Sequence, residues 1–511
     1  MTTSGYLGID AGTQGLSVIF TDRDLHVLAV GEGSYDMVPG LPAECYEQQP
    51  PEWIAALEQA MRQLRRNLPA EHAEFQVLAI GISGQMHGEV LVDESGAAVG
   101  PARLWCDARN EAEGHELTER FSVKVPKRAT VARWLWTLRN QPEKARAARH
   151  MTTPAGWISY CLTGQWTLGI GDAAGMFPID PRTFDYNAKL LTSFQELAGD
   201  GSTPLRDLLP AVRRAGEDAG VLHAAGAQLL GLPAGIPVAP AEGDQPAALA
   251  GSLIGDAGMV SVSFGTSVCA NSVGDRPFAG VSNAVDHFCA PDGKPINMVW
   301  LRNGTTFMNS VVEMFGDARG GDRGAGFAAV IPKVLEAAPD CGGLLALPFM
   351  DDEPGLNVSH GGTAMILGLN ADNATAGNVV KAALLATMFN LRLGSEVLDA
   401  QGFPRTKLVL TGGLTKTPAL SQILADVFRT PVTLPASAEE GTAWGAALMA
   451  KFRHQVLQGT ESDWAAFLKK HADPQEQVYS PAEAAAENYN GVYNKYKRLM
   501  EVQDALDAAV R

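Results

Sequence analysis

The chain has 511 residues, of which 46% are hydrophobic and 19% are charged. This length fits two or three domains of roughly 150 residues each and excludes a single small module, and the composition excludes a disordered chain. Lys and Arg total 40 against 57 Asp and Glu, and the resulting net charge of −17 argues against a nucleic-acid partner. The net charge does not exclude a nucleotide that binds to backbone N–H groups.

The six cysteines are widely spaced and form no CxxC pair. The chain begins MTTSGYLGID, without a basic flank followed by an apolar stretch, and no run of 18 apolar residues occurs. We therefore expect reduced thiols, a cytoplasmic protein and no membrane partner.

Short strands and turns open the chain. Strands are predicted over 6–9, 16–20 and 25–30, then a helix over 53–68 and a buried strand over 75–82. Three antiparallel strands, a helix and a further strand are typical of half of an actin-like nucleotide-binding unit.

The middle of the chain alternates loops and helices and ends in a proline-rich segment over 232–237, which marks the join to a second domain. Residues 259–272 read MVSVSFGTSVCANS and resemble the opening LGIDAGTQGLSVIF. This similarity indicates internal duplication, with one ATP-facing hairpin per domain. The later predicted elements are a helix over 383–398, a strand over 407–410, helices over 418–428 and 441–452, and a charged helix over 481–511.

Three separated turns carry residues suited to phosphate binding. Asp10 ends an apolar strand and precedes Gly12, Thr13, Gln14 and Gly15, a pattern that suits Mg²⁺ and phosphate, although an ordinary hairpin turn is the alternative.

The turn at Gly265 and Thr266 offers the same backbone-exposing chemistry, and Gly412 and Gly413 lie between a strand and a helix. The alternative for the glycine pair is a tight connection that needs positive φ. The chain has neither a GxxxxGK[ST] loop nor a dinucleotide fingerprint, so a nucleotide would use these separated turns in a cleft between two domains.

Two further segments carry polar side chains that suit catalysis and hydroxyl-rich ligands. Asp244 stands between a strand end and a small-residue helix, where it can accept a proton from a hydroxyl or act as a helix N-cap. The loop with Gln85, Met86 and His87 suits a hydroxyl-rich ligand, and Asp107 with its neighbour Arg109 could join the same pocket. The alternatives are a structural histidine and a surface ion pair.

Taken together in this order, these segments closely resemble the FGGY carbohydrate kinases. The loop over 83–88 followed by LWCDAR over 104–109 resembles in particular the branch of the family that phosphorylates xylulose, and EQQPPEW over 47–53 is similar to the family's N-terminal pattern. The segment over 364–369, with Asn378 further on, fits the start of the second family signature.

The resemblance implies an α/β, actin-like (ribonuclease H-like) ATPase fold of two duplicated domains with a cleft between them. It implies ATP-dependent phosphorylation of a sugar hydroxyl, most directly the conversion of D-xylulose to D-xylulose 5-phosphate. The implied cofactors are ATP and Mg²⁺, and a homodimer is one option for the oligomeric state. The domains would span 1–245 on the sugar and phosphate side and 246–455 on the nucleotide side, with 456–511 as a helical segment packed on the body.

The resemblance also implies a role for each candidate residue. Asp244 would be the general base and would contact the sugar, and Asp10 would position the Mg–ATP phosphates and hold the metal through water. The remaining sugar contacts would be Gln85, Met86, His87 and Asp107. The nucleotide contacts would be Gly12, Thr13, Gln14, Gly265, Thr266, Gly412, Gly413 and Gln422.

Two departures from the family pattern put the sugar in question. Where the family has a Gly-Glu-Arg-x-Pro loop, this chain reads MDDEPG over 350–355 and lacks the arginine, and Leu385 replaces the closing acidic residue of the signature. The alternatives are a kinase for ribulose, a longer ketose, erythritol or glycerol, and an actin-like nucleotide switch without sugar kinase activity.

Overall fold

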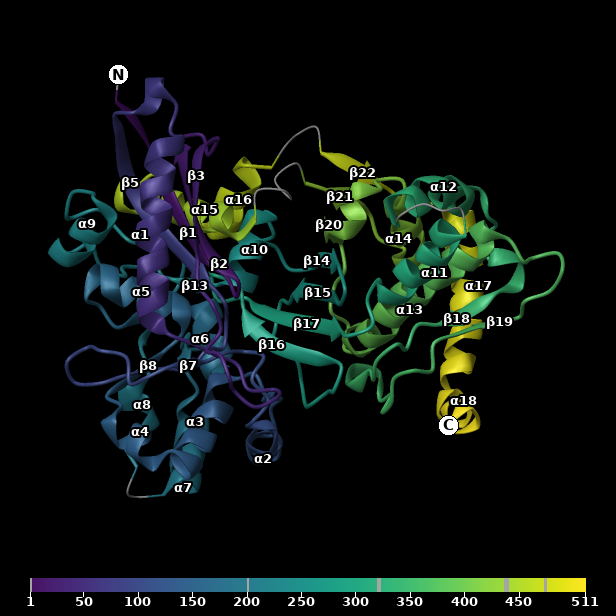
Figure 1. The fold of residues 1–511 in the computed structure, drawn as a ribbon, viewed down its shortest axis with the longest axis horizontal. Coiled ribbons are helices and arrows are strands. Elements are labelled where there is room, and N and C mark those ends of the chain that lie inside the picture. Colours follow the sequence, from purple (N-terminus) through teal and green to yellow (C-terminus); the bar gives the residue numbers. More distant parts are fainter. Residues whose placement is uncertain (1, 200–201, 319–322, 436–440, 473–475) are drawn as a thin grey trace. The chain divides into compact units, whose positions relative to one another are not determined.

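The computed structural model describes residues 2–199, 202–318, 323–435, 441–472 and 476–511, and it divides into two compact units (Figure 1). Unit 1 comprises 1–255, 287–296 and 439–472, and unit 2 comprises 256–286, 297–438 and 473–511. The chain thus returns to unit 1 after residue 438, so this division differs from predicted boundaries at 245 and 455.

Unit 1 is built on a five-stranded sheet of order β13-β5-β1-β2-β3. The first three strands in the chain pair antiparallel, whereas β5 runs parallel to β1 and β13 runs parallel to β5. In register, Asp10 lies beside Ser83, and Ser83 lies beside Glu242. The carboxyl ends of three parallel strands therefore meet at one edge. The strands are β1 (Thr3–Ala11), β2 (Gly15–Asp22), β3 (Val27–Ser34), β5 (Phe75–Gly84) and β13 (Glu242–Gly243).

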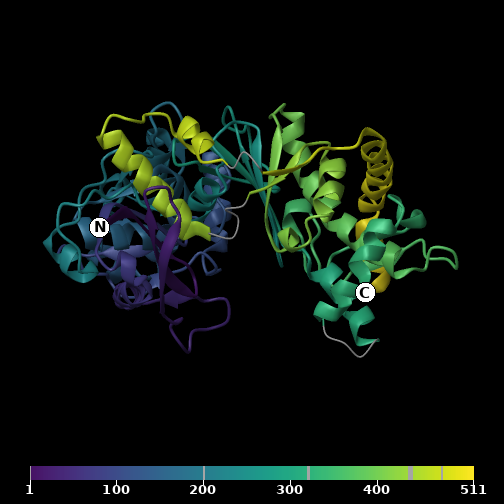
Figure 2. The ribbon, with the colours of Figure 1, turned by 90° about the horizontal axis from the view of Figure 1, so that it is seen from above.

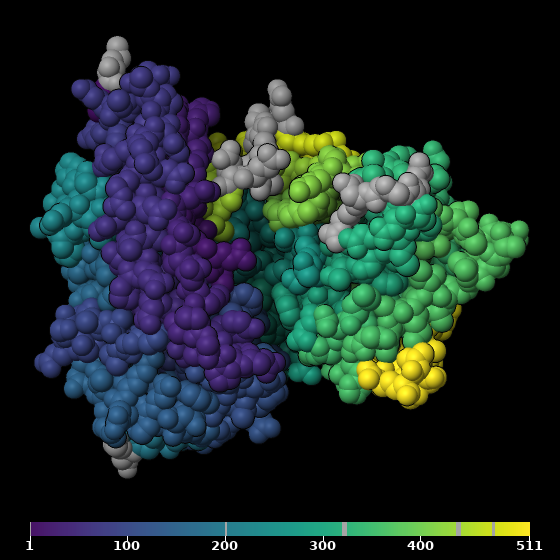
Figure 3. All heavy atoms as spheres, viewed as in Figure 1, coloured from purple at the N-terminus to yellow at the C-terminus, as the bar shows by residue number. Residues whose placement is uncertain are grey.

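Two helices cover opposite faces of this sheet. Helix α1 (Pro50–Asn67) packs on β2 and β3, and it starts earlier than predicted because proline is well tolerated in the first helical turn. Figure 3 shows its outer face at the surface of unit 1. Helix α15 (Gly441–Leu457) packs on β1 and β5 (Figure 2).

Glycines allow α15 to approach the sheet closely. A Cβ atom added at Gly8 would lie 2.0 Å from the carbonyl oxygen of Ala443, and one at Gly81 would lie 1.8 Å from that of Ala446. The backbone of the helix therefore touches the backbone of the strands.

Unit 1 also contains further helices and short strands. They are β4 (Glu47–Gln48), β6 (Val90–Val92), β7 (Ala102–Arg103), α2 (Glu111–Phe121), α3 (Thr130–Asn140), α4 (Pro142–Ala147), β8 (His150–Thr152), α5 (Pro154–Thr163), β9 (Thr167–Gly169), α6 (Ile170–Met176), β10 (Ile179–Asp180), β11 (Asp185–Tyr186), α7 (Ala188–Ala198), α8 (Leu205–Leu208), β12 (Ala211–Arg213), α9 (Ala224–Leu230), α10 (Asp244–Gly251) and α16 (Trp464–Lys470).

A second sheet of order β16-β17-β15-β14-β20-β21-β22 repeats the design, and apart from residues 287–289 of β16 and 295–296 of β17 its strands belong to unit 2. Its hairpin β14-β15 is antiparallel and β20 runs parallel to β14, just as β5 runs parallel to β1 beside the hairpin β1-β2. This topology confirms the predicted duplication of the hairpin. The strands are β14 (Met259–Phe264), β15 (Val268–Val273), β16 (Val285–Cys289), β17 (Pro295–Leu301), β20 (Lys407–Gly412), β21 (Val432–Leu434) and β22 (Gln477–Tyr479).

Helices and a separate two-stranded sheet complete unit 2. They are α11 (Thr306–Asp317), α12 (Arg323–Glu336), α13 (Ala376–Ala400), α14 (Leu420–Phe428), α17 (Glu483–Met500), α18 (Gln503–Val510), β18 (Leu345–Leu347) and β19 (Met365–Leu367). The final charged segment, predicted to pack on the body, contains α17, which packs on α13 and α14. Its buried stripe includes Tyr493 and Tyr496, whose rings contact Phe389.

Across the described residues, we find no helix with the length and apolar character that crossing a membrane requires.

Candidate active site

Three of the predicted functional segments of unit 1 follow the three parallel strands that end at one sheet edge. Asp10 lies near the end of β1, Met86 and His87 follow β5, and Asp244 follows β13. Open parallel sheets bind ligands beyond the carboxyl ends of their strands, so the topology itself makes this edge the candidate site.

Two hydroxyl groups fix the orientation of Asp10. Ser83 Oγ donates to Asp10 Oδ1 at 2.7 Å, and Thr442 Oγ1, at the start of α15, donates to Oδ2. Burial raises the pKa of Asp10, while these two hydrogen bonds favour the ionised form. Sequence reasoning missed Thr442, because its contact with Asp10 joins residues more than 400 positions apart.

The turn that follows Asp10 is held through its carbonyl groups. Tyr35 Oη lies 2.5 Å from the carbonyl oxygen of Gly12 and 3.0 Å from that of Gly15, and Gln48 Nε2 donates to the carbonyl of Thr13 at 2.8 Å. Carbonyl oxygens that accept these hydrogen bonds point their partial negative charge toward the protein donors and away from the opposite side of the turn, where an anion could bind. This geometry suits the predicted phosphate contact, and Gln14 is exposed at the tip.

Asp244 is the first residue of α10 and remains partly exposed, and Gly243 rather than Asp244 is the N-cap. Burial, and then the negative charge of Asp10, raises the pKa of Asp244 to about 7. A carboxylate with this pKa can take up a proton near neutral pH, as a general base must.

Two fully buried carboxyl groups that sequence reasoning missed support the turn before Asp244. Glu242 accepts hydrogen bonds from the backbone N–H groups of Gly171 at 3.2 Å and Asp172 at 2.8 Å, and Thr153 Oγ1 donates to Asp172 Oδ2 at 2.6 Å. Burial, and then the charge of Asp244, raises the pKa of Asp172 to about 8, and burial also raises that of Glu242.

The loop after β5 brings Met86 and His87 to this edge. Met86 is buried against Gly243, where an added Cβ would lie 2.2 Å from Met86 Cγ. His87 has a left-handed backbone with φ of 65°, and its Nδ1 lies 3.0 Å from the carbonyl oxygen of Gly175. The loop therefore lies directly beside the residue that precedes Asp244.

Gln85 and Asp107, for which the family resemblance implies sugar contacts, are both fully buried and engaged with protein groups. Gln85 Nε2 donates to Gln48 Oε1 at 2.9 Å. The carboxylate of Asp107 accepts hydrogen bonds from Arg109 and from the backbone N–H of Tyr46 at 2.9 Å.

Burial opposes ionisation of Asp107, but the hydrogen bonds and charge of Arg109 outweigh it and lower the pKa of this carboxyl. Both side chains thus support the loops that carry the site.

Unit 2 brings its two predicted turns to one sheet edge. Phe264 of β14 lies beside Gly412 of β20, so the turns at 265–266 and 412–413 are neighbours. Gly412 has φ of 77°, and a Cβ there would lie 2.8 Å from the carbonyl oxygen of Phe264, so a side chain is excluded. The backbone N–H groups of Gly304 and Thr305 hold the first turn by donating to its carbonyls at 2.9 Å.

Gln422, predicted to contact adenosine, also makes hydrogen bonds within unit 2. Its Nε2 donates to Asp426 Oδ1 at 2.9 Å and to the carbonyl of Ser480 at 2.8 Å, so it joins α14 to the segment before α17.

The loop over 350–355, which lacks the family arginine, is anchored by Glu353. This buried carboxylate accepts the backbone N–H groups of Arg302 at 3.0 Å and Asn303 at 2.9 Å, and Arg302 also forms an ion pair with Asp352. The loop therefore holds the segment before Gly304, and Arg302 supplies a guanidinium from the end of β17.

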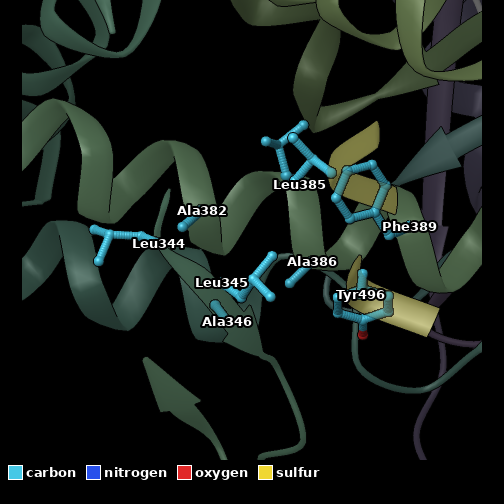
Figure 4. Close-up of a pocket in the computed structure, with 9 residues that line it drawn as sticks. Leu344, Leu345, Ala346, Ala382, Leu385, Ala386, Phe389 and Tyr496 are labelled. Atoms are coloured by element: carbon cyan, nitrogen blue, oxygen red, sulfur yellow. The ribbon is translucent and has the colours of Figure 1, made fainter. Parts of the chain in front are cut away.

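Leu385, the other departure from the family pattern, lines an apolar pocket (Figure 4). Its neighbours there include Leu344, Ala382, Phe389 and Tyr496. An acidic side chain at this position would be buried among apolar groups, so leucine fits its surroundings.

Comparison with known protein families identifies the family to which this chain belongs. Residues 5–251 match the N-terminal domain, and residues 260–453 the C-terminal domain, of the FGGY family of carbohydrate kinases. The chain belongs to this family. It is therefore a carbohydrate kinase, a phosphotransferase with a sugar or polyol as acceptor.

Curated relatives and solved structures are similar to this FGGY kinase over most of its length. The xylulose kinase of Streptomyces rubiginosus is 30% identical over 458 residues, 87% of each chain, and that of Haemophilus influenzae is 26% identical over 507 residues, 96% of this chain and 98% of the relative.

The xyloylose kinase structure from Brucella ovis aligns with a TM-score of 0.81 at 24% identity and covers 98% of this chain and 99% of its own. The xylulose kinase structure from Rhodospirillum rubrum aligns with a TM-score of 0.83 at 20% identity, with the same coverage. These structures confirm the two-domain, actin-like fold of the FGGY kinase.

Proposed function

We propose that this FGGY kinase transfers the γ-phosphoryl group of ATP to O5 of D-xylulose, giving D-xylulose 5-phosphate and ADP. The similarity to xylulose kinases over 87% or more of the chain supports this sugar. The observation that carries the chemistry is Asp244, a partly exposed carboxylate at the end of β13 whose pKa lies near 7.

In the proposed reaction, the oxygen of the sugar hydroxyl forms a bond to the γ-phosphorus as the bond from that phosphorus to the β,γ-bridging oxygen breaks. The carboxylate of Asp244 accepts the hydroxyl proton, and the bond electrons leave with ADP. Met86 and His87, on the neighbouring loop, orient the sugar beside Asp244.

Asp10 is the residue that fits a role toward Mg²⁺. Both of its oxygens accept a hydroxyl hydrogen bond, so lone pairs remain for water molecules around the ion. Among the described residues, no group of three or more His, Cys, Asp or Glu side chains gathers to hold a metal. That agrees with Mg²⁺, which proteins often bind through one or two carboxylates, water and substrate phosphates. When bound, the ion neutralises charge on the phosphates.

For the nucleotide we propose the turns that expose backbone. The turn at 12–15 in unit 1 and the turn at 265–266 in unit 2 would contact phosphates, and Gly412 and Gly413 would lie against the adenosine. Backbone N–H groups provide the positive potential that a chain with a net charge of −17 lacks overall.

A sugar screen tests the proposal. ADP release is measured with ATP, Mg²⁺ and one acceptor at a time, from D-xylulose, ribulose, a longer ketose, erythritol, glycerol and gluconate. We expect D-xylulose to give the highest kcat/KM, and Asp244→Ala to abolish the sugar-dependent part of the signal. A higher kcat/KM for another acceptor would make that acceptor, and not D-xylulose, the substrate. ADP release that no acceptor increases would favour a nucleotide switch.

A further inference from the structure

A buried arginine stands behind the loop that carries Met86 and His87. Arg133, on α3 of unit 1, is fully buried, and its guanidinium faces backbone carbonyls. Nη1 donates to the carbonyls of His87, at 3.2 Å, and of Arg128, and Nη2 lies 3.5 Å from that of Asp107. One guanidinium thus reaches both loops of unit 1 for which the sequence predicted sugar contacts.

A second donor from the same helix reaches the same carbonyl. Thr130, the first residue of α3, is fully buried, and its Oγ1 donates to the carbonyl oxygen of His87 at 3.2 Å. His87 has φ of 65°, a left-handed backbone conformation that is uncommon and unfavourable for residues other than glycine. Two donors on one carbonyl offset part of this cost, so α3 stabilises an unusual backbone at this position.

The ring of His87 is fixed as tightly as its backbone. Its Nδ1 contacts the carbonyl oxygen of Gly175, and a Cβ added at Gly175 would lie 2.9 Å from the ring. With the carbonyl held by α3 and the ring held against α6, the side chain has little freedom left.

A buried ion pair attaches α3 to the same loop from the other side. Glu89, two residues after His87, pairs with Arg103 at 2.8 Å, and neither side chain is exposed. Arg103 Nη2 also donates to the carbonyl of Arg133 at 2.5 Å and to Thr137 Oγ1 at 2.6 Å. Helix α3 therefore contacts this loop both directly, at His87, and through the ion pair of Arg103 with Glu89.

Burying an arginine whose hydrogen-bond acceptors are neutral carbonyls is costly. Burial, and then the charge of Arg103, lowers the pKa of Arg133 to about 9, which still leaves it charged at pH 7. Apolar side chains fill a helix interface at lower cost, so the arrangement indicates a role in holding the two loops.

We propose that Arg133 and Thr130 are positioning residues that set the backbone of His87 and thereby the affinity of the kinase for its sugar. Neither residue touches the reacting atoms. The inference rests on the proposed function, because His87 must contact the acceptor.

The matched pair Thr130→Val and Thr130→Ser tests this proposal, since valine keeps the shape of threonine without its hydroxyl and serine keeps the hydroxyl. Kinetics use the acceptor that the wild-type protein phosphorylates best. We expect Thr130→Val to raise KM for the sugar about three- to tenfold, the effect of one lost hydrogen bond. KM for ATP and kcat should stay within about twofold, and Thr130→Ser should resemble the wild type.

The arginine is tested by Arg133→Met and Arg133→Lys, with Arg139→Met as the control on the exposed side of α3. We expect KM for the sugar to rise more than about tenfold in Arg133→Met, less in Arg133→Lys, and little in Arg139→Met. Circular dichroism and size-exclusion chromatography identify a variant that does not fold, and in that case the Thr130 pair decides. Equal sugar KM values in Thr130→Val and Thr130→Ser, or parallel changes in the KM for ATP, would overturn the proposal.

Crystal structures of the wild type and Thr130→Val separate this proposal from the proposed function, because they need no activity. We expect the backbone of His87 to leave its left-handed conformation, or its ring to leave Gly175, in the variant. An unchanged His87 would contradict the positioning role even if no acceptor is found. A wild type that phosphorylates a sugar other than xylulose would contradict only the proposed substrate.

Discussion

At the scale of single residues, the ionisation of Asp244 connects structure to turnover. Its carboxylate lies after β13, and burial together with Asp10 raises its pKa to about 7. The same environment that makes it harder to ionise makes it a better acceptor for the proton of a sugar hydroxyl.

Asp244→Asn keeps the size of the side chain and removes its basicity. We expect kcat to fall about 10²-fold or more, within the range of general-base catalysis, while KM for ATP and for the sugar changes little. Steady-state kinetics measure this, with Asp207→Asn, at an exposed position of α8, as the control. Turnover within about threefold of the wild type would show that another group accepts the proton.

The pH dependence of kcat/KM follows from the same group. Asp244 must be ionised to act and its pKa is raised to about 7, so kcat/KM should be half-maximal near pH 7, approach its plateau about one unit higher and fall about tenfold per unit at lower pH. Initial rates between pH 5 and 8.5 at low sugar concentration give this profile. A midpoint near 4, where an ordinary carboxyl titrates, would contradict the raised pKa.

At the scale of elements, close backbone contact joins α15 to the sheet of unit 1. Gly81→Ala would place a Cβ 1.8 Å from the carbonyl oxygen of Ala446 and so force the helix away from β5. We expect a loss of about 1–3 kcal/mol in the free energy of unfolding, as for other overpacked interfaces.

The matched control is Gly491→Ala in α17, where an added Cβ meets no atom within 4 Å. Alanine there should stabilise the helix by about 0.5–1 kcal/mol. Urea unfolding followed by circular dichroism compares the two variants, and equal effects would mean that the contact with α15 is not tight.

Helix α13 offers a test of the unusual Leu385. Leu385→Glu restores an acidic residue in a pocket lined by apolar side chains, and the unpaired charge should lower the thermal midpoint by several degrees. Ala400→Glu, at the exposed end of the same helix, should change it little. Differential scanning fluorimetry measures both, and equal midpoints would show that position 385 tolerates a charge.

At the scale of the whole molecule, the elements were largely predictable and the long-range contacts were not. Hydrophobic periodicity indicates both hairpins and α1, because each is a local pattern. The hydrogen bonds of Thr442 to Asp10 and of Glu242 to Gly171 join distant segments, which no local pattern shows.

The same limit applies to polar residues for which ligand contacts are predicted. Gln85, Asp107 and Gln422 are polar residues next to predicted turns, and the sequence does not show whether such a residue faces a ligand or a neighbouring loop. In the structure each is hydrogen-bonded to protein groups. The sequence does not distinguish Arg133 from other arginines, because the burial that makes it unusual depends on the packing of α3.

The stability of the protein should depend on pH through the buried carboxyl groups. The pKa of Asp172 is raised to about 8 in the folded state, against about 4 when unfolded, so its stabilising contribution is complete below pH 4 and is lost as pH rises through 8. We expect the free energy of unfolding to fall between pH 6.5 and 8.5, and the fall to be smaller by about 2 kcal/mol in Asp172→Asn. Urea unfolding at the two pH values gives both numbers, and identical pH dependence in the two proteins would show that Asp172 ionises normally.

The central claim is that this FGGY kinase places the γ-phosphoryl group of ATP on O5 of D-xylulose. The most direct test is ³¹P nuclear magnetic resonance of the protein with ATP, Mg²⁺ and D-xylulose. The account predicts a new phosphomonoester signal that grows as the ATP signals decay and that splits through coupling to the two hydrogens on C5. A signal only from inorganic phosphate, or a phosphoester at another carbon, would contradict it.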